Sequence, residues 1–362
     1  MTLPLNGQKN TPAGEGGNTS AGFRKNGRGR APVPFFACVA LALVLIMVLS
    51  VGTGSVSISP GEIARILLSG GDGSAASDIV LKIRAPRVLA AALFGGALAL
   101  SGYLLQVFFG NPIAGPFVLG ISSGAKTAVA LTMIVLLGSY RAVPSAVLVL
   151  AAFAGSAAAT GFIILVARRV RHMASLLVAG IMSGYLCSAL TDFLITFADD
   201  ADIVNLHGWS EGSFAGMTMD GVLTGALICG AGFLFSILLA KPIGAYQMGE
   251  RYARSVGVNI RVFRIALILV SGMLSACVTA FAGPVSFIGI AVPFLTRRIL
   301  KTQEPLVLIP AVVLSGAVAC CVCDLIARTA FAPLELYIGT VTSLFGAPVV
   351  IFMLVTRRRE AG

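Results

Sequence analysis

The sequence predicts an all-α polytopic membrane protein with about ten transmembrane helices. Of its 362 residues, 57% are hydrophobic and 11% are charged, whereas about a quarter of an average soluble domain is charged. The mean hydropathy is +0.94. Ten bilayer-spanning helices need roughly 200 residues, which leaves room for short loops and a tail but for no sizeable soluble domain. This composition excludes an ordinary soluble enzyme, a disordered chain and a disulfide scaffold.

Residues 1–32 are rich in Gly, Asn, Ser, Thr and Arg and lack apolar periodicity. This pattern predicts a disordered, basic tail. The apolar run at 33–53 follows directly. It is too long for the apolar part of a signal peptide, so we interpret it as a retained membrane anchor. We expect a single transmembrane domain over residues 33–358.

Nine further apolar runs follow the anchor, and each predicts a helix. The eighth of the ten runs is short and lies between Gly283-Pro284 and Arg297-Arg298, which indicates a tilted or partial helix. The nine runs cover approximately residues 88–109, 115–138, 143–167, 174–197, 218–240, 262–282, 285–300, 305–327 and 338–356.

The basic residues divide unequally when the N-terminus is placed inside and the spans alternate. Lys and Arg collect in cytoplasmic segments of membrane proteins, so the division predicts ten spans, both termini in the cytoplasm and a location in the cytoplasmic (inner) membrane. It also explains the net charge of +11 without a nucleic-acid partner. The inside segments hold Lys9, Arg24, Lys25, Arg28, Arg30, Arg168, Arg169, Arg171, Lys241, Arg251, Arg254, Arg261, Arg264, Arg297, Arg298, Lys301, Arg357, Arg358 and Arg359. The outside segments hold Arg65, Lys82, Arg84, Arg87, Arg141 and Arg328.

No catalytic constellation is present in the sequence. The histidines are His172 and His207, both interpreted as solvated loop residues, and no Walker motif, glycine-rich nucleotide loop or zinc spacing occurs. The cysteines in 320–323 are accompanied by one acidic residue, Asp324, so we interpret them as small buried residues. We expect no enzyme activity, metal or cofactor in this chain, and any ATP is bound by a partner chain.

The segment 241–267, between the sixth and seventh spans, is too long for a tight turn and too polar to enter lipid. Met248, Tyr252, Ser255 and Val256 fall near helical spacing, and Gly257 is a helix stop signal. From the residues alone, two interpretations stay open. Either the basic side chains bind lipid headgroups, or a short helix inserts into a soluble partner.

Arg84 and Arg87 lie three residues apart at the outer end of the second span, and Arg328 lies at the outer end of the ninth. They either extend to the membrane interface or face an acidic docking protein or an anionic solute. Outside arginines run against the positive-inside rule, which favours the functional interpretation.

Lys126 lies within the third span, where a lysine costs about 2.5–3.5 kcal/mol to insert. Two interpretations stay open for it. The side chain either reaches the inner interface or faces a transport pathway, where it would attract an anionic ferric chelate.

Several blocks of the sequence, in this order, resemble the permease subunits of the type II ABC importers for iron-siderophore, heme and vitamin B12. The resemblance covers about residues 35–358. The blocks are RAPRVLAAALFGGALALSGYLLQ (84–106), NPIAGPFVLGISSGA (111–125), LLVAGIMSG (176–184), Trp209 with Gly212-Ser213, GERYARSVGVN (249–259), AGPVSFIGIAVPFLTR (282–297) and DLIARTAFAPLELYIGTVTSLFGAPVVIFML (324–354).

The resemblance implies the type II ABC importer permease fold in a lipid membrane. It further implies a second permease copy or paralogue, two ATP-binding subunits and an extracytoplasmic substrate-binding protein as partners. The expected function is ATP-driven import of an iron chelate by alternating access, with a siderophore ahead of heme or cobalamin. The alternative is a secondary ion-coupled transporter, which requires carboxylates within the membrane, and Asp192 and Asp324 are the candidates.

The resemblance also implies roles for individual residues. Arg84, Arg87 and Arg328 match arginines that meet acidic residues of the binding protein. The region of about 247–259 matches the coupling helices that contact the ATPase. This sequence departs from the family at Phe294, where a histidine is usual, and at Lys126, where small or apolar residues are usual. The coupling residues are Gly249, Glu250, Arg251, Ala253, Arg254, Val256, Gly257 and Val258.

Overall fold

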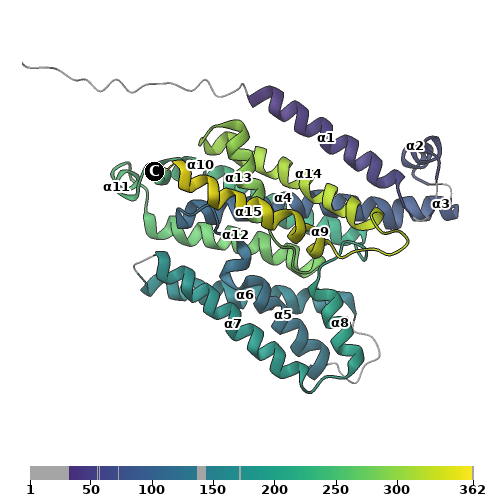
Figure 1. The fold of residues 1–362 in the computed structure, drawn as a ribbon, viewed down its shortest axis with the longest axis horizontal. Helices are drawn as coiled ribbons and strands as arrows, with labels where there is room; N and C mark the ends of the chain where they lie inside the picture. Colours follow the sequence, from purple (N-terminus) through teal and green to yellow (C-terminus); the bar gives the residue numbers. More distant parts are fainter. Residues whose placement is uncertain are drawn as a thin grey trace, which may run out of the picture.

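The computed structural model describes residues 32–360 except 55, 57, 72, 137–143 and 171–172. The predicted tail therefore lies outside the described residues up to residue 31, as do Arg141, Arg171, His172 and the side chains of Arg357, Arg358 and Arg359. Within the described part, all regular structure is helical (Figure 1). Two elements, η1 and η3, are π-helical, and η2 is a 3₁₀ helix. In chain order the elements are α1 (Pro32–Gly52), α2 (Pro60–Ser69), α3 (Ala75–Asp78), η1 (Ile79–Arg84), α4 (Ala85–Phe109), η2 (Pro116–Leu119), α5 (Ile121–Ala130), η3 (Leu131–Leu136), α6 (Ser145–Arg169), α7 (Met173–Ile195), α8 (Asp200–Ser210), α9 (Met219–Leu238), α10 (Ala240–Gln247), α11 (Glu250–Ser255), α12 (Ile260–Ala282), α13 (Ile288–Leu300), α14 (Pro305–Thr329) and α15 (Ile338–Glu360).

The all-α membrane fold is confirmed, and each of the ten predicted spans corresponds to a helix. Eight helices of the described part are long and apolar enough to cross a bilayer. The third and eighth predicted spans are shorter, at Ile121–Val135 and Ile288–Leu300. The 13 residues of α13 reach about 20 Å, less than the roughly 30 Å of the hydrocarbon core. The expectation of a partial helix there is therefore confirmed.

The connection between the first two spans contains structure that hydropathy did not predict. The hydroxyl of Ser59 accepts a hydrogen bond from the backbone N–H of Glu62 and begins α2, as expected for an N-cap residue. The helical run from Ala75 to Phe109 then joins α3, η1 and α4 into 35 residues. The second span thus extends well beyond its predicted start at residue 88.

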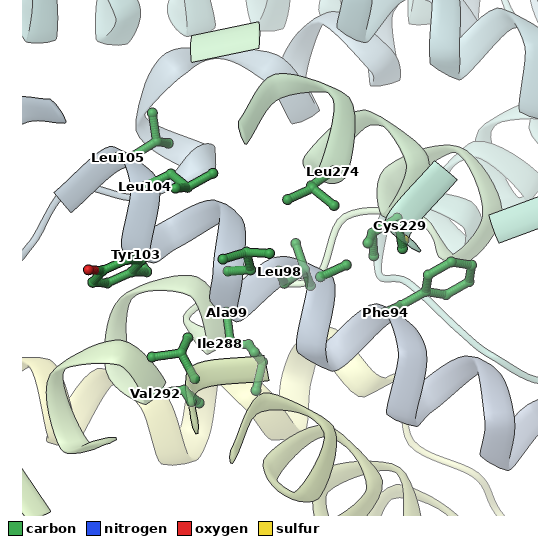
Figure 2. Packing of buried hydrophobic residues seen from close by; sticks show 14 of the residues in the cluster. Phe94, Leu98, Ala99, Tyr103, Leu104, Leu105, Cys229, Leu274, Ile288 and Val292 are labelled. Carbon is green, nitrogen blue, oxygen red and sulfur yellow. The ribbon is translucent and has the colours of Figure 1, made fainter. Parts of the chain in front are cut away.

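Helix α4 is the centre of the core and packs against α9, α12, α13 and α14. Figure 2 shows its side chains Phe94, Leu98 and Tyr103 among residues of α9, α12 and α13. The ring of Phe94 stacks on Phe281, with 5.9 Å between the ring centroids. Because α4 is surrounded by helices, its position determines the position of its neighbours.

Glycines allow α4 to approach two neighbours at backbone distance. A methyl group on Gly102 would overlap the carbonyl group of Gly289 in α13. A methyl group on Gly95 would overlap Gly316 in α14. Small residues at such crossings are typical of membrane helix packing.

The helices α5, α6 and α7 pack together, and α6 also packs against α12. Figure 1 shows these three helices, with α8, on one side of the α4 core. The two ends of the molecule differ. The α11 end carries α10 and α11, and the opposite end, the α2 end, carries α2, α3 and α8 (Figure 1).

Candidate functional site

The three arginines expected at one external face do lie together, at the α2 end. Arg84 ends η1, Arg87 lies in the first turn of α4, and Arg328 lies in the last turn of α14. All three side chains are nevertheless buried, with exposed fractions of 5%, 7% and 8%. Their guanidinium groups therefore bind other parts of this chain.

Arg84 and Arg328 bind the C-terminal end of α1. Arg84 Nη1 donates to the carbonyl of Val51 at 2.9 Å, and Arg328 Nη2 donates to the carbonyl of Ser50 at 3.0 Å. The last carbonyl groups of a helix have no partner within the helix, and cations are favoured beside them. The two arginines thus attach α1 to α4 and α14.

Arg87 and Arg328 share the buried carboxylate of Asp324. Arg87 Nε donates to Asp324 Oδ1 at 3.0 Å, and Arg328 Nε lies 3.2 Å from Asp324 Oδ2 as an ion pair without hydrogen-bond geometry. Arg87 Nη1 also donates to Glu335 at 2.8 Å. This cluster joins the start of α4 to the end of α14 and to the segment before α15.

Docking by these arginines stays a prediction. The sequence-based expectation placed their charges on an open surface, whereas in this structure the charges bind α1, Asp324 and Glu335. The spacing of Asp324 and Arg328 was a local signal for their pairing, but Arg87 pairs with a residue 237 positions away, which no local pattern indicates.

The predicted coupling region, about residues 247–259, runs from the end of α10 through α11 and forms a projection at the α11 end (Figure 1). Gly249 joins α10 to α11 with a φ of 117°, and Gly257 follows α11 with a φ of 87°. Such values favour glycine. Ala253 is fully buried, and its carbonyl accepts the backbone N–H of Val258. The helix expected from the spacing is present and ends at Ser255, two residues before the predicted stop.

Glu250 connects α11 to α12. Its carboxylate accepts hydrogen bonds from Arg254 at 2.6 Å and from Arg264, in α12, at 2.8 Å. The hydrogen bond from Arg254, with the charge of Arg264, lowers the pKa of Glu250 despite partial burial, so the group is ionised at neutral pH. Glu250 thus links α11 to the second turn of α12 through an ion pair.

Apolar side chains cover the outside of this projection. Met248, Tyr252 and Val256 are 65%, 46% and 53% exposed. Tyr252 and Val256, four residues apart, lie on one face of α11, whereas Met248 precedes Gly249 at the end of α10. Arg251, on the same helix, is exposed as well. Exposed apolar side chains beside basic ones are typical of a contact with a protein or with a membrane surface.

Lys126 lines a cavity of about 360 Å³ at the α2 side of α5. Glu211, which follows α8, and Gly339, at the start of α15, lie on the same cavity. This placement argues against a side chain that reaches toward the α11 end, and the pathway role of Lys126 stays a prediction. Besides Phe117 and Pro284, the rest of the lining carries hydroxyl groups: Ser122, Ser123, Ser188, Ser210, Ser286, Thr340 and Ser343.

The remaining positions named in the sequence analysis are two aspartates, Phe294 and the cysteines in 320–323. Asp324 pairs with arginines, as described, whereas Asp192 is exposed on α7. Phe294 is half-buried on α13, next to Pro293 within that helix. Cys320, Cys321 and Cys323 are buried, as the sequence predicted.

Known proteins resemble this chain over most of its length. The model of the FecCD transport family matches residues 42–356. The vitamin B12 import system permease proteins BtuC of Salmonella typhi and of Escherichia coli O9:H4 (strain HS) are each 38% identical over 281 residues, which cover 77% of this chain and 84% of theirs. A solved structure described as a metal-chelate type ABC transporter in an inward-facing conformation has a TM-score of 0.79 and 25% sequence identity, and the match covers 90% of this chain and all of that one.

We expect Asp324→Asn to destabilise the protein strongly. The change keeps the shape of the side chain but leaves Arg87 and Arg328 buried without their shared carboxylate. Loss of one partner of a buried ion pair costs about 3–5 kcal/mol. The measurement is thermal unfolding of the purified protein in detergent.

The matched control is Asp220→Asn, which removes an exposed carboxylate from the first turn of α9 and should cost about 0.3–1 kcal/mol. Equal unfolding temperatures for the two variants would show that the cluster contributes nothing beyond a surface charge.

Proposed function

The chain belongs to the FecCD transport family, and on this premise we propose that it is the permease subunit of an ATP-driven importer that carries a metal chelate into the cytoplasm. The observation that carries the proposal is the family match over residues 42–356, which includes the helical bundle, the Lys126 cavity and the α10–α11 projection. Transport proceeds by alternating access, in which the bundle opens to one side at a time.

The proposed cargo class is a metal chelate. The sequence-based expectation put a ferric siderophore first, whereas the two named relatives import vitamin B12 and the solved relative is described as a metal-chelate transporter. Cobalamin, which contains cobalt, and the ferric siderophores are therefore the two candidate cargoes. Lys126 and the hydroxyl groups of its cavity supply hydrogen-bond donors for oxygen atoms of either chelate.

The proposed assembly contains a second permease copy or paralogue, two ATP-binding subunits and an external binding protein. The exposed apolar side chains of Met248, Tyr252 and Val256 support contact with an ATP-binding subunit. The ion pair between Glu250 and Arg264 gives that contact a route to α12, which packs against α4, α6 and α9. The external protein docks at the α2 end in this proposal.

The proposed orientation places the α11 end in the cytoplasm. Basic residues gather there on α6, α11, α12 and α13, which the positive-inside rule favours. The start of α1 and the end of α15 both point toward that end (Figure 1), so both termini are cytoplasmic in this proposal.

The direct test is uptake by liposomes that contain the chain with its ATP-binding subunits and binding protein. We expect accumulation of a labelled chelate with ATP and none with a non-hydrolysable analogue. Labelled cobalamin and a labelled ferric siderophore, offered separately and in competition, identify the cargo. Uptake driven by a proton or sodium gradient without ATP would contradict the proposal and favour a secondary ion-coupled transporter.

The double change Tyr252→Asp and Val256→Asp should weaken the association with the ATP-binding subunit by about tenfold or more, since apolar anchor residues dominate such contacts. Co-purification from membranes measures the association. Val204→Asp, at an exposed apolar position on α8 at the α2 end, should leave it unchanged. Normal co-purification of the double variant would remove the coupling role from this face.

Lys126→Met should lower the uptake of an anionic ferric chelate by about three- to tenfold, because a charged hydrogen-bond donor is lost from the cavity. Lys126→Arg should retain most of the uptake, and Lys241→Met, an exposed change at the α11 end, should retain all of it. Uptake is measured in the same liposomes. Unchanged uptake by the Lys126→Met variant, with normal ATPase association, would end the pathway role of this side chain.

A further inference from the structure

A second cavity, at the α11 end, combines a basic rim with an apolar floor. Its volume is about 360 Å³. It lies where the end of α6 and the start of α7 meet the end of α11 and the start of α12. We propose that this cavity binds the phosphate headgroup of an anionic phospholipid, with the upper part of an acyl chain against its floor.

Four arginines line the cavity: Arg168, Arg254, Arg261 and Arg264. In the described part of the chain, Glu250 is the carboxylate that pairs with them, and it binds Arg254 and Arg264. Neither Arg168 nor Arg261 has a carboxylate partner among the described residues. Four guanidinium groups with one carboxylate leave an excess of positive charge that an anion neutralises.

The arginines also offer unused donors. Arg264 Nε is buried and has no hydrogen-bond acceptor, although Nη2 of the same side chain binds Glu250. A buried donor without an acceptor costs free energy. Guanidinium groups bind phosphate oxygens through two parallel hydrogen bonds. Arg168 and Arg261 are exposed, so their donors are the ones open to a phosphate in this cavity.

The floor of the cavity distinguishes a lipid from a soluble anion. Phe108, Leu176, Ile265 and Ile268 form an apolar surface below the arginines. Outside the cavity, α12 presents the exposed apolar residues Val262 and Leu269. A phosphate ion gains nothing from such a surface, whereas an acyl chain is compatible with it. Basic pockets between membrane helices at the cytoplasmic side are suited to anionic headgroups.

A lipid bound in this cavity would contact residues that hold the coupling region to α12. Arg254 and Arg264 bind Glu250 between α11 and α12, and Arg168 extends the same charge cluster to α6. A phosphate held by these groups joins α6 to the α11–α12 connection and shields the repulsion among the four arginines. The proposal does not depend on which chelate the protein carries.

The test measures lipid binding by the full-length chain, purified in detergent, with native mass spectrometry and thermal unfolding. The probes are phosphatidylglycerol, phosphatidylcholine and inorganic phosphate. Phosphatidylglycerol should bind about tenfold or more tightly than phosphatidylcholine and should raise the unfolding temperature as its concentration increases. Inorganic phosphate at equal concentration should have little effect.

The double change Arg168→Gln and Arg261→Gln should remove most of the preference for phosphatidylglycerol. Arg168→Lys with Arg261→Lys keeps the charges but loses the paired hydrogen bonds, and should show an intermediate preference. Lys241→Gln with Lys301→Gln removes two charges from exposed positions at the same end and should bind as the wild type does.

Three results would overturn the proposal. Equal affinity of the wild type for the two lipids would remove the headgroup preference. Equal stabilisation by inorganic phosphate would assign the cavity to a soluble anion. Unchanged lipid binding by the Arg168/Arg261 variants, together with loss of the ATP-binding subunit from the complex, would assign these arginines to the protein contact.

Discussion

Close packing around α4 is the constraint on which the rest of the structure depends. Transfer of an apolar helix surface from lipid to a neighbouring helix gains little from the hydrophobic effect, so helices in a bilayer associate through tight contact and interhelical hydrogen bonds. Gly95 and Gly102 bring α4 to backbone distance from α14 and α13. Ser101 and Ser271 exchange hydrogen bonds between α4 and α12, at 2.9 and 3.1 Å. These contacts hold α4 on three sides.

The charges within this apolar bundle are placed where they bind backbone or opposite charges. Arg84 and Arg328 bind the terminal carbonyl groups of α1, and Asp324 lies between Arg87 and Arg328. An unpaired charge in such surroundings is costly, and these contacts give each arginine at the α2 end a partner within the chain. Their structural role also limits any docking role, because each guanidinium group is already engaged.

Helix α12 links the features that concern transport. Its first turns carry Arg264, which binds Glu250 of the coupling projection, and its middle packs against α4 and α6. The same turns form part of the basic cavity. A force applied to α11 and an anion bound beside it therefore act on the same helix, while Lys126 and its cavity lie toward the other end.

The sequence by itself determined the helical class, the approximate spans, the short helix between the sixth and seventh spans, and the family, because hydropathy, helical period and long motif blocks are properties of local sequence. It also indicated the partial eighth span from its flanking Gly283-Pro284. The tertiary structure alone decided that Arg87 binds Asp324 and Glu335, that Arg84 binds the end of α1, and that Lys126 shares a cavity with Glu211. These contacts join residues far apart in the chain. A local pattern shows that a charge is present, but only the packing of distant helices decides which group neutralises it.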